Sequence, residues 1–154
     1  NKNGVRLQAI GDLQGLPMEC QKSLYESIEK TKSNSNITLV LALNYSSKWE
    51  IKEMVKTLSV KLSNKEITDE DITDELISAH LTTEKIPDPE LLIRTSGERR
   101  VSNFLLWQIA YTEFVFLDLF WPDFGRNEFI SAVYDFQNRE RRFGQVSEQI
   151  KSEE

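Results

Sequence analysis

Short runs of residues that are continuously apolar, or apolar at every second position, predict four strands along this chain. The run VRLQAIG alternates, which is typical of a strand with one covered face. The run ITLVLALNY is nearly all apolar with β-branched residues early, which is typical of a buried parallel strand. LLIRT follows two prolines that favour extended backbone, and FVFLDLF is again a short apolar run. The predicted strands cover residues 5–11, 37–45, 91–95 and 114–120.

The segments between and after these runs predict helices: in most of them apolar residues recur three and four positions apart, which is the spacing of a helix with one inward face, whereas the segment from about Ser102 to Thr112 is apolar on all faces. Acidic residues gather at the start of the third such segment, where the helix dipole favours them. The predicted helices run from Pro17 to about Lys32, from a cap at Ser46 or Ser47 through Leu58, over 67–81, from about Ser102 to Thr112, and from a cap at Asn127 through a stripe of Phe129, Val133 and Phe136.

The resulting order, β-α-β-α-α-β-α-β-α, predicts the fold class. Strands that are separated by helices imply a largely parallel sheet with helices on both faces, and hence an α/β protein. A chain of 154 residues with 39% hydrophobic content can bury one core. We therefore expect a single α/β domain over residues 1–144, followed by a loose tail over 145–154.

Charge narrows the classes of ligand. The net charge of −6 argues against a nucleic-acid-binding protein, because such domains are usually basic. Positive charge is nevertheless bunched: residues 94–100 hold three arginines against one glutamate, and residues 139–142 repeat that balance. A local basic site on an acidic protein fits a small anionic ligand better than a polymer.

Cysteine content and hydropathy indicate in which cellular compartment the protein is expected. Cys20 is the single cysteine, so the chain has no intrachain disulfide, and a reducing cytoplasm is the simplest location. No apolar run approaches the roughly 18 residues of a membrane span, and no signal peptide opens the chain. The sequence starts without Met and enters strand-like alternation almost at once, so we expect a fragment of a longer protein.

The stretch PELLIRTSGERRVSN carries the candidate chemistry. A predicted buried strand ends in a loop of small residues with fixed positive charge, and a predicted helix follows directly. α/β proteins hold anions in this way, so the stretch indicates a phosphate or pyrophosphate site. Other interpretations stay open for each residue taken alone: an arginine in a solvated ion pair, Ser102 as a helix cap and Glu113 as a surface charge.

Four segments of the chain resemble one family. LLIRTSGERRVSNFLLWQIAYTEFVF, FWPDF and NRERRFG resemble the C-terminal half of the undecaprenyl pyrophosphate synthases, which are cis-prenyltransferases. LALNYSSKWEI resembles the middle strand and helix of that family, in which an NYGGR-like sequence is common; Ser46, Ser47 and Lys48 depart from it. The resemblance covers essentially the whole chain.

The resemblance implies a reaction and a set of site residues. The family condenses isopentenyl pyrophosphate with an allylic pyrophosphate, farnesyl pyrophosphate, to form the membrane lipid undecaprenyl pyrophosphate. Arg94 and Arg100 match the positions that hold the incoming pyrophosphate, and Ser102 adds a hydroxyl. Glu113 matches a glutamate associated with Mg²⁺. Arg99 stands where some relatives have a histidine, so a metal role is lost there.

Several other residues are candidates for the binding site, but most of them also have a purely structural interpretation. Gly97 lets the loop bend close to a ligand, and Asn44 either forms a turn or faces the ligand cleft. Arg139 and Arg142 belong to a segment that in the family reaches toward the active site or the partner subunit, but such a segment is usually a solvated helix end. The lone His80 is expected to be a packed or surface residue.

The resemblance also exposes a gap. In the family, an Asp-Gly-Asn-Gly-Arg type motif holds the allylic pyrophosphate and magnesium, and nothing like it occurs in this sequence. We therefore expect that this chain holds no catalytic aspartate, carries the isopentenyl pyrophosphate half-site alone, and is inactive in isolation. The family is homodimeric, and a helix from Ser102 to Thr112 that is apolar on all faces would also need a covering surface.

Two other classes stay open at the level of sequence. The chain is alternatively a noncatalytic subunit of a heteromeric cis-prenyltransferase, or an unrelated phosphate-binding α/β module. The complete RTSGERRVSN run favours a bacterial single-type enzyme. An Asp-Gly-Asn motif upstream in the parent reading frame would decide among the three.

Overall fold

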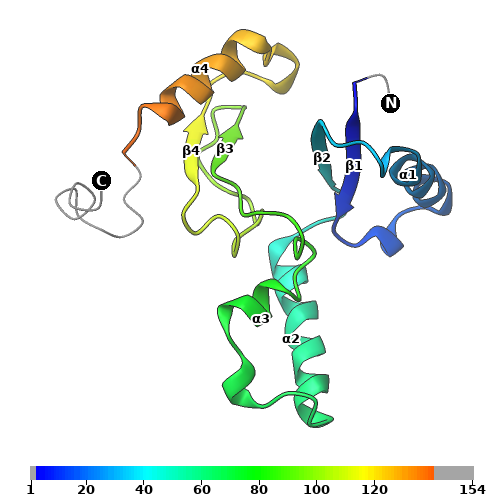
Figure 1. The fold of residues 1–154 in the computed structure, drawn as a ribbon. Coiled ribbons are helices and arrows are strands. Elements are labelled where there is room, and N and C mark those ends of the chain that lie inside the picture. Colours follow the sequence, from blue (N-terminus) through cyan, green and yellow to red (C-terminus); the bar gives the residue numbers. More distant parts are fainter. Residues whose placement is uncertain (1–2, 141–154) are drawn as a thin grey trace. The chain divides into compact units, whose positions relative to one another are not determined.

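The computed structural model describes residues 3–140, and these residues form two compact units. Within the described residues, the first unit contains residues 3–87 together with 103–105, and the second contains residues 88–102 together with 106–140. Each unit is built around its own pair of parallel strands (Figure 1). The expected tail over 145–154 and Arg142 lie outside the described residues, and the single domain over 1–144 stays a prediction.

The first unit begins with a β-α-β arrangement. Strand β1 (Val5–Ile10) pairs in parallel with β2 (Ile37–Ala42), and helix α1 (Met18–Thr31) connects them and packs on β1 (Figure 1). A short 3₁₀ turn, Leu13–Gly15, precedes α1. Parallel strands need a crossover of this length, and the alternating apolar residues of β1 give the helix a face to cover. The predicted first helix and both strands are confirmed.

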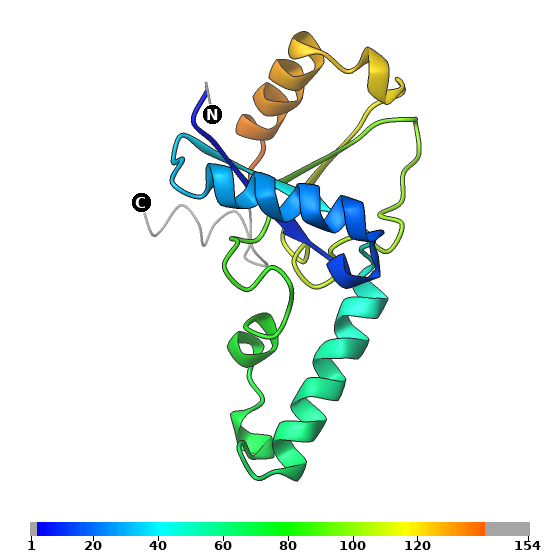
Figure 2. The same cartoon turned by 90° about the vertical axis from the view of Figure 1, so that its right-hand side faces the viewer.

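Helix α2 (Ser47–Ser63) follows β2, and α3 (Asp74–Ser78) lies beside it (Figure 2). The hydroxyl of Ser46 accepts a hydrogen bond from the Trp49 amide at 3.3 Å, which confirms the predicted serine cap. Met54 and Leu58, four residues apart, are buried as the helical spacing predicts. A 3₁₀ turn, Asp69–Asp71, precedes α3, so the third predicted helix is divided into two short pieces.

The second unit pairs β3 (Leu91–Arg94) in parallel with β4 (Glu113–Phe116), with Leu91 opposite Glu113 and Arg94 opposite Phe116. A 3₁₀ turn, Trp121–Asp123, leads to α4 (Arg126–Gln137), which contacts β4 (Figure 1). The prediction that Asn127 caps this helix is wrong. Gly125 occupies the cap position, because the Glu128 carboxylate accepts its amide at 3.0 Å and so satisfies the helix start.

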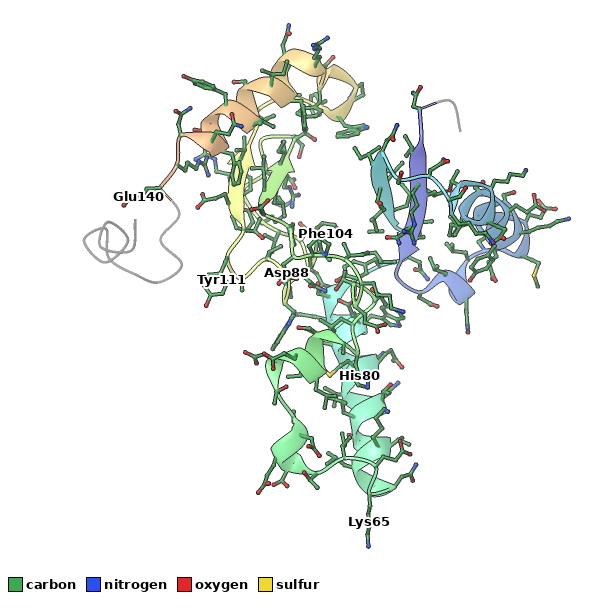
Figure 3. All side chains as sticks on the ribbon, viewed as in Figure 1. Lys65, His80, Asp88, Phe104, Tyr111 and Glu140 are labelled. Atoms are coloured by element: carbon green, nitrogen blue, oxygen red, sulfur yellow. The ribbon has the colours of Figure 1, made fainter. Side chains whose placement is uncertain are left out.

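The predicted helix from Ser102 to Thr112 is also wrong, because the structure has a series of turns there. The backbone φ angles of Ser102, Asn103 and Leu105 are 49°, 62° and 50°, in the left-handed region. A right-handed helix cannot pass through such residues. The apolar residues of the segment do not form one helical surface, since Gln108 and Ile109 are buried whereas Tyr111 is 68% exposed (Figure 3).

Strand β2 is parallel as predicted, but it is not buried. Ile37 and Leu39 are 62% and 50% exposed. The reason is that, among residues 3–140, β2 pairs only with β1, so its other edge has no neighbouring strand. The α/β class with parallel strands is confirmed, while the extent of burial is not. None of the helices within 3–140 is long and apolar enough to cross a membrane.

Candidate functional site

The loop that follows β3 is held by its backbone against the segment after β4. The amide of Ser96 donates to the Leu119 carbonyl at 2.7 Å, and the amide of Gly97 donates to the Leu117 carbonyl at 2.9 Å. Gly97 has φ of 70°, and a Cβ at this position would lie 3.0 Å from Asp118 Oδ1. The positive φ favours glycine at this position, and a Cβ here would require the Asp118 carboxylate to move, whereas the expectation that the loop bends close to a ligand stays a prediction.

Arg94, the last residue of β3, directs its guanidinium into this loop. Its Nη1 donates to Ser102 Oγ at 2.9 Å and to the backbone carbonyl of Arg100, and its Nη2 donates to the Glu98 carboxylate. The Arg94 side chain is only 22% exposed. These contacts hold both Nη atoms of the guanidinium at the carboxyl end of a parallel strand, where ligands of α/β proteins bind.

Glu98 joins the two predicted arginines into one cluster. Nη2 of Arg100 lies 2.5 Å from Glu98 Oε2, the same oxygen that Arg94 contacts. Arg100 is 65% exposed, so its end of the cluster is open to solvent. The structure thus brings Arg94, Arg100 and Ser102 together, as the sequence indicated. Sequence reasoning counted Glu98 only as a charge and missed its place between the arginines.

Glu113 lies at the other end of the strand pair. Since Arg94 is opposite Phe116, three residues beyond Glu113, about 10 Å of strand separates Glu113 from the Arg94 cluster. Arg139 Nη1 donates to Glu113 Oε2 and to the Phe114 carbonyl, both at 2.9 Å. Within residues 3–140, no three His, Cys, Asp or Glu side chains are grouped so that they could hold a metal ion.

Arg139 therefore forms an ion pair with Glu113, the first residue of β4. Its Nη2 also lies 2.5 Å from Asp135 Oδ2 on α4. The hydrogen bonds to Glu113 and then to Asp135 raise the pKa of Arg139 above its usual range, so it remains charged. Its contacts tie the end of α4 to β4 and orient the Glu113 carboxylate.

Asn44, in the first unit, forms a turn. Its φ is 48°, and its Nδ2 donates to the backbone oxygen and to Oδ2 of Asp12, each at 3.2 Å. Asparagine tolerates the left-handed conformation better than most residues. The turn-forming interpretation of Asn44 therefore has direct geometric support.

The first unit contains a buried hydrogen-bond network that the sequence did not predict. The hydroxyl of Tyr45 donates to Glu50 Oε2 at 2.6 Å, and the amide and hydroxyl of Thr82 donate to Glu50 Oε1 at 2.8 and 2.5 Å. Glu50 is 2% exposed. Helical spacing places Glu50 on α2 but gives no signal that Thr82, far along the chain, supplies its partners. His80, as expected, is a packed residue whose Nδ1 lies 2.8 Å from the Leu76 carbonyl (Figure 3).

This network predicts an alkaline loss of stability. Burial and then the hydrogen bond to Glu50 raise the pKa of Tyr45 from 10.0 to about 12. Because the folded state holds the phenol proton more tightly than the unfolded state, this stabilisation is complete below pH 10.0 and is lost as the pH rises toward about 12. We expect the advantage of the wild-type chain over Tyr45→Phe in thermal midpoint to shrink over that range. A constant difference between the two midpoints would contradict the assignment.

A family model and curated relatives match this chain over nearly its whole length. The family model described as putative undecaprenyl diphosphate synthase matches residues 1–144. An isoprenyl transferase of Porphyromonas gingivalis is 49% identical over 148 residues, which are 96% of this chain and 58% of that protein. A ditrans,polycis-undecaprenyl-diphosphate synthase of Vibrio parahaemolyticus, described as (2E,6E)-farnesyl-diphosphate specific, is 46% identical over 152 residues, with 99% and 61% coverage.

Solved structures give the same result. Lavandulyl diphosphate synthase from Lavandula x intermedia, in complex with dimethylallyl diphosphate, superposes with a TM-score of 0.90 and 33% identity, over 94% of this chain and 62% of that one. A probable undecaprenyl diphosphate synthase from Campylobacter jejuni gives a TM-score of 0.80 and 33% identity, over 94% and 65%. The chain spans about three-fifths of the length of the curated relatives it matches.

Proposed function

Because the chain belongs to the undecaprenyl diphosphate synthase family of cis-prenyltransferases, we propose that it supplies the isopentenyl pyrophosphate half-site of such an enzyme. The complete enzyme condenses isopentenyl pyrophosphate with farnesyl pyrophosphate and repeats the step to make undecaprenyl pyrophosphate. The name of the Vibrio parahaemolyticus relative, which specifies a farnesyl diphosphate, supports this choice of primer.

The arrangement of Arg94, Arg100 and Ser102 around Glu98 carries the proposal. Two guanidinium groups converge on one carboxylate oxygen, and a hydroxyl lies 2.9 Å from the more enclosed of them. A pyrophosphate oxygen, like a carboxylate oxygen, is negatively charged and accepts hydrogen bonds from paired N–H donors. The substrate therefore takes the place of Glu98 between the arginines, and Ser102 adds a further hydrogen bond.

We propose Glu113 as the ligand that this chain offers to Mg²⁺. One carboxylate is sufficient for such an ion, because magnesium takes one or two carboxylates and completes its coordination shell with water and substrate phosphates. When bound, Mg²⁺ would neutralise charge on a pyrophosphate group. Arg139, at 2.9 Å from Glu113 Oε2, orients the carboxylate. The separation of Glu113 from the Arg94 loop along β4 implies that further ligands come from outside that loop.

Labelled isopentenyl pyrophosphate tests the function. A chimera joins this chain to the part of the Porphyromonas gingivalis isoprenyl transferase that the chain does not cover. With farnesyl pyrophosphate and Mg²⁺, the chimera should incorporate label into lipid, and chelation of Mg²⁺ should stop incorporation. The parent transferase serves as the control. A folded chimera that binds no isopentenyl pyrophosphate would refute the proposal and favour an unrelated phosphate-binding module; one that binds it without turnover would favour a noncatalytic subunit.

We also propose a homodimer, as the family resemblance implies. Tyr111, in the segment first expected to be a helix, is 68% exposed, and exposed apolar residues mark interfaces when they cluster. The chimera should sediment as a two-fold dimer, and Tyr111→Glu or Leu106→Glu should convert it to a monomer. Met18→Glu, which changes an exposed residue of α1 in the other unit, is the matched control. A wild-type chimera that is monomeric at high concentration would contradict the dimer.

We also propose that the protein is located in the cytoplasm. Cys20 is a free and exposed thiol, which fits a reducing compartment. Both substrates are soluble anions, and the lipid product leaves the protein for a membrane. Fractionation of cells that express the whole protein, with the thiol state of Cys20 as the readout, would test the location.

A further inference from the structure

The Glu98 carboxylate is bound by both arginines of the proposed half-site. One of its oxygens, Oε2, accepts a hydrogen bond from Nη2 of Arg94 and lies 2.5 Å from Nη2 of Arg100. Proteins bind carboxylate and phosphate anions with guanidinium groups arranged in this way. Glu98 is therefore an anion of the chain itself, bound at the position that the proposed function gives to the pyrophosphate.

The turn before Glu98 keeps its carboxylate close to the arginines. Ser96 and Gly97 have φ of 77° and 70°, and their amides donate to the carbonyls of Leu119 and Leu117. These hydrogen bonds hold the backbone on the N-terminal side of Glu98 in one conformation. A group attached by a short connection competes with free ligands at a high effective concentration. A dissolved anion that approaches the arginines therefore meets a strong competitor.

The contact between Glu98 and the arginines can still open. The side chain of Glu98 is 39% exposed and that of Arg100 is 65% exposed, and ion pairs in contact with water contribute little free energy. Arg94 does not depend on Glu98 for its position, because its Nη1 donates to the Ser102 hydroxyl and to the Arg100 carbonyl. When Glu98 turns toward solvent, the more enclosed arginine stays in place for a ligand.

We propose that Glu98 is a specificity-determining residue, which occupies the anion site of its own chain and has to be displaced by the ligand. Displacement lowers the affinity of every anion by the same factor. Inorganic phosphate, which binds through its charge alone, is then too weak to fill the site. Isopentenyl pyrophosphate has a second phosphate and an apolar group, and it still binds. This inference deepens the proposed function and rests on it.

Three variants of the chimera test the role of Glu98. Glu98→Gln keeps the size of the side chain and removes its charge, and Glu98→Ala removes both. Asp118→Asn is the matched control, because it removes one negative charge from an exposed residue beside Gly97. Among the residues that the structure describes, Asp118 forms no ion pair with Arg94 or Arg100. Calorimetry gives the Kd of isopentenyl pyrophosphate, inorganic pyrophosphate and inorganic phosphate for each variant.

Both Glu98 variants should bind all three anions about three- to tenfold more tightly than the wild-type chimera, the range expected for the loss of two partly exposed ion pairs. Asp118→Asn should change each Kd by less than about twofold, as is usual for an exposed charge without a partner. In stopped-flow measurements, the gain of the Glu98 variants should lie in the association rate constant. The reason is that their site is open more of the time, whereas the bound state is the same.

The outcomes separate this inference from the proposed function. A folded chimera that binds none of the three anions, with or without Glu98, removes both. If the wild-type chimera binds isopentenyl pyrophosphate and neither Glu98 variant binds it more tightly, the inference alone is overturned. Equal tightening by Asp118→Asn also overturns it, since the effect would then be one of general charge. Tighter binding of inorganic pyrophosphate by the Glu98 variants, in a chimera that does not bind isopentenyl pyrophosphate, supports competition by Glu98 and refutes the proposed function. Either Glu98 variant suffices if the other does not fold.

Discussion

The 154-residue chain by itself should show no incorporation of labelled isopentenyl pyrophosphate into lipid, under conditions in which the chimera turns over. Its sequence contains no Asp-Gly-Asn-Gly-Arg type motif, which in the family ionises the allylic substrate, and the chain spans 58% of the Porphyromonas gingivalis relative. Without a group that holds the allylic pyrophosphate and its magnesium, the leaving group has no stabilisation. The expected loss is the whole of the activity.

This result has to be separated from a failure to fold. Each unit has only two paired strands within residues 3–140, and isolated two-stranded sheets are marginally stable. Circular dichroism and thermal unfolding of the chain should therefore accompany the assay. Turnover by the chain at a rate near that of the Porphyromonas gingivalis transferase would show that the missing motif is not needed.

Replacing Arg94 with alanine should weaken isopentenyl pyrophosphate far more than the allylic substrate. Losing a charge-assisted pair costs roughly 1.5–3 kcal/mol, which is about a ten- to hundredfold change in affinity. Arg100→Ala should fall at the lower end of that range, because Arg100 is 65% exposed whereas Arg94 is 22% exposed. Exposed ion pairs are weaker because water screens them.

Steady-state kinetics of the chimera, with each substrate varied in turn, measures both effects. Arg99→Ala is the matched control, since it removes an exposed positive charge from the same loop. It should change the KM for isopentenyl pyrophosphate by less than either of the other substitutions. An equal rise in the KM of both substrates for Arg94→Ala would mean that the arginine does not belong to one half-site.

Local patterns in the sequence were sufficient for most of the elements. Alternation predicted β1, and continuous apolar runs predicted β2, β3 and β4 as parallel strands, because these patterns reflect which faces a strand covers. Ser46 was a candidate cap because its side chain satisfies amides within its own helix. The turn-and-charge pattern after β3 likewise indicated an anion site, since a strand end and its loop are contiguous in sequence, and the family resemblance assigned Arg94, Arg100 and Ser102 to that site; the structure brings these three residues together.

The segment from Ser102 to Thr112 shows where local patterns failed. Its residues were expected to form a helix that is apolar on all faces, but Asn103 is bound to the start of α2, more than fifty residues earlier in the chain. That contact, together with the positive φ angles, prevents a helix. Propensity is a weak preference, and tertiary contacts override it.

The sequence by itself determined the α/β class, the strand that carries Arg94 and the cluster of charge that follows, because each depends on neighbours along the chain. Only the tertiary structure decided that Glu98 lies between Arg94 and Arg100, that Glu113 pairs with Arg139 near the far end of β4, and that Asn103 caps α2. These contacts depend on strand register and on the path of loops. Register and loop path are fixed by packing between distant segments, and no short pattern in the sequence encodes them.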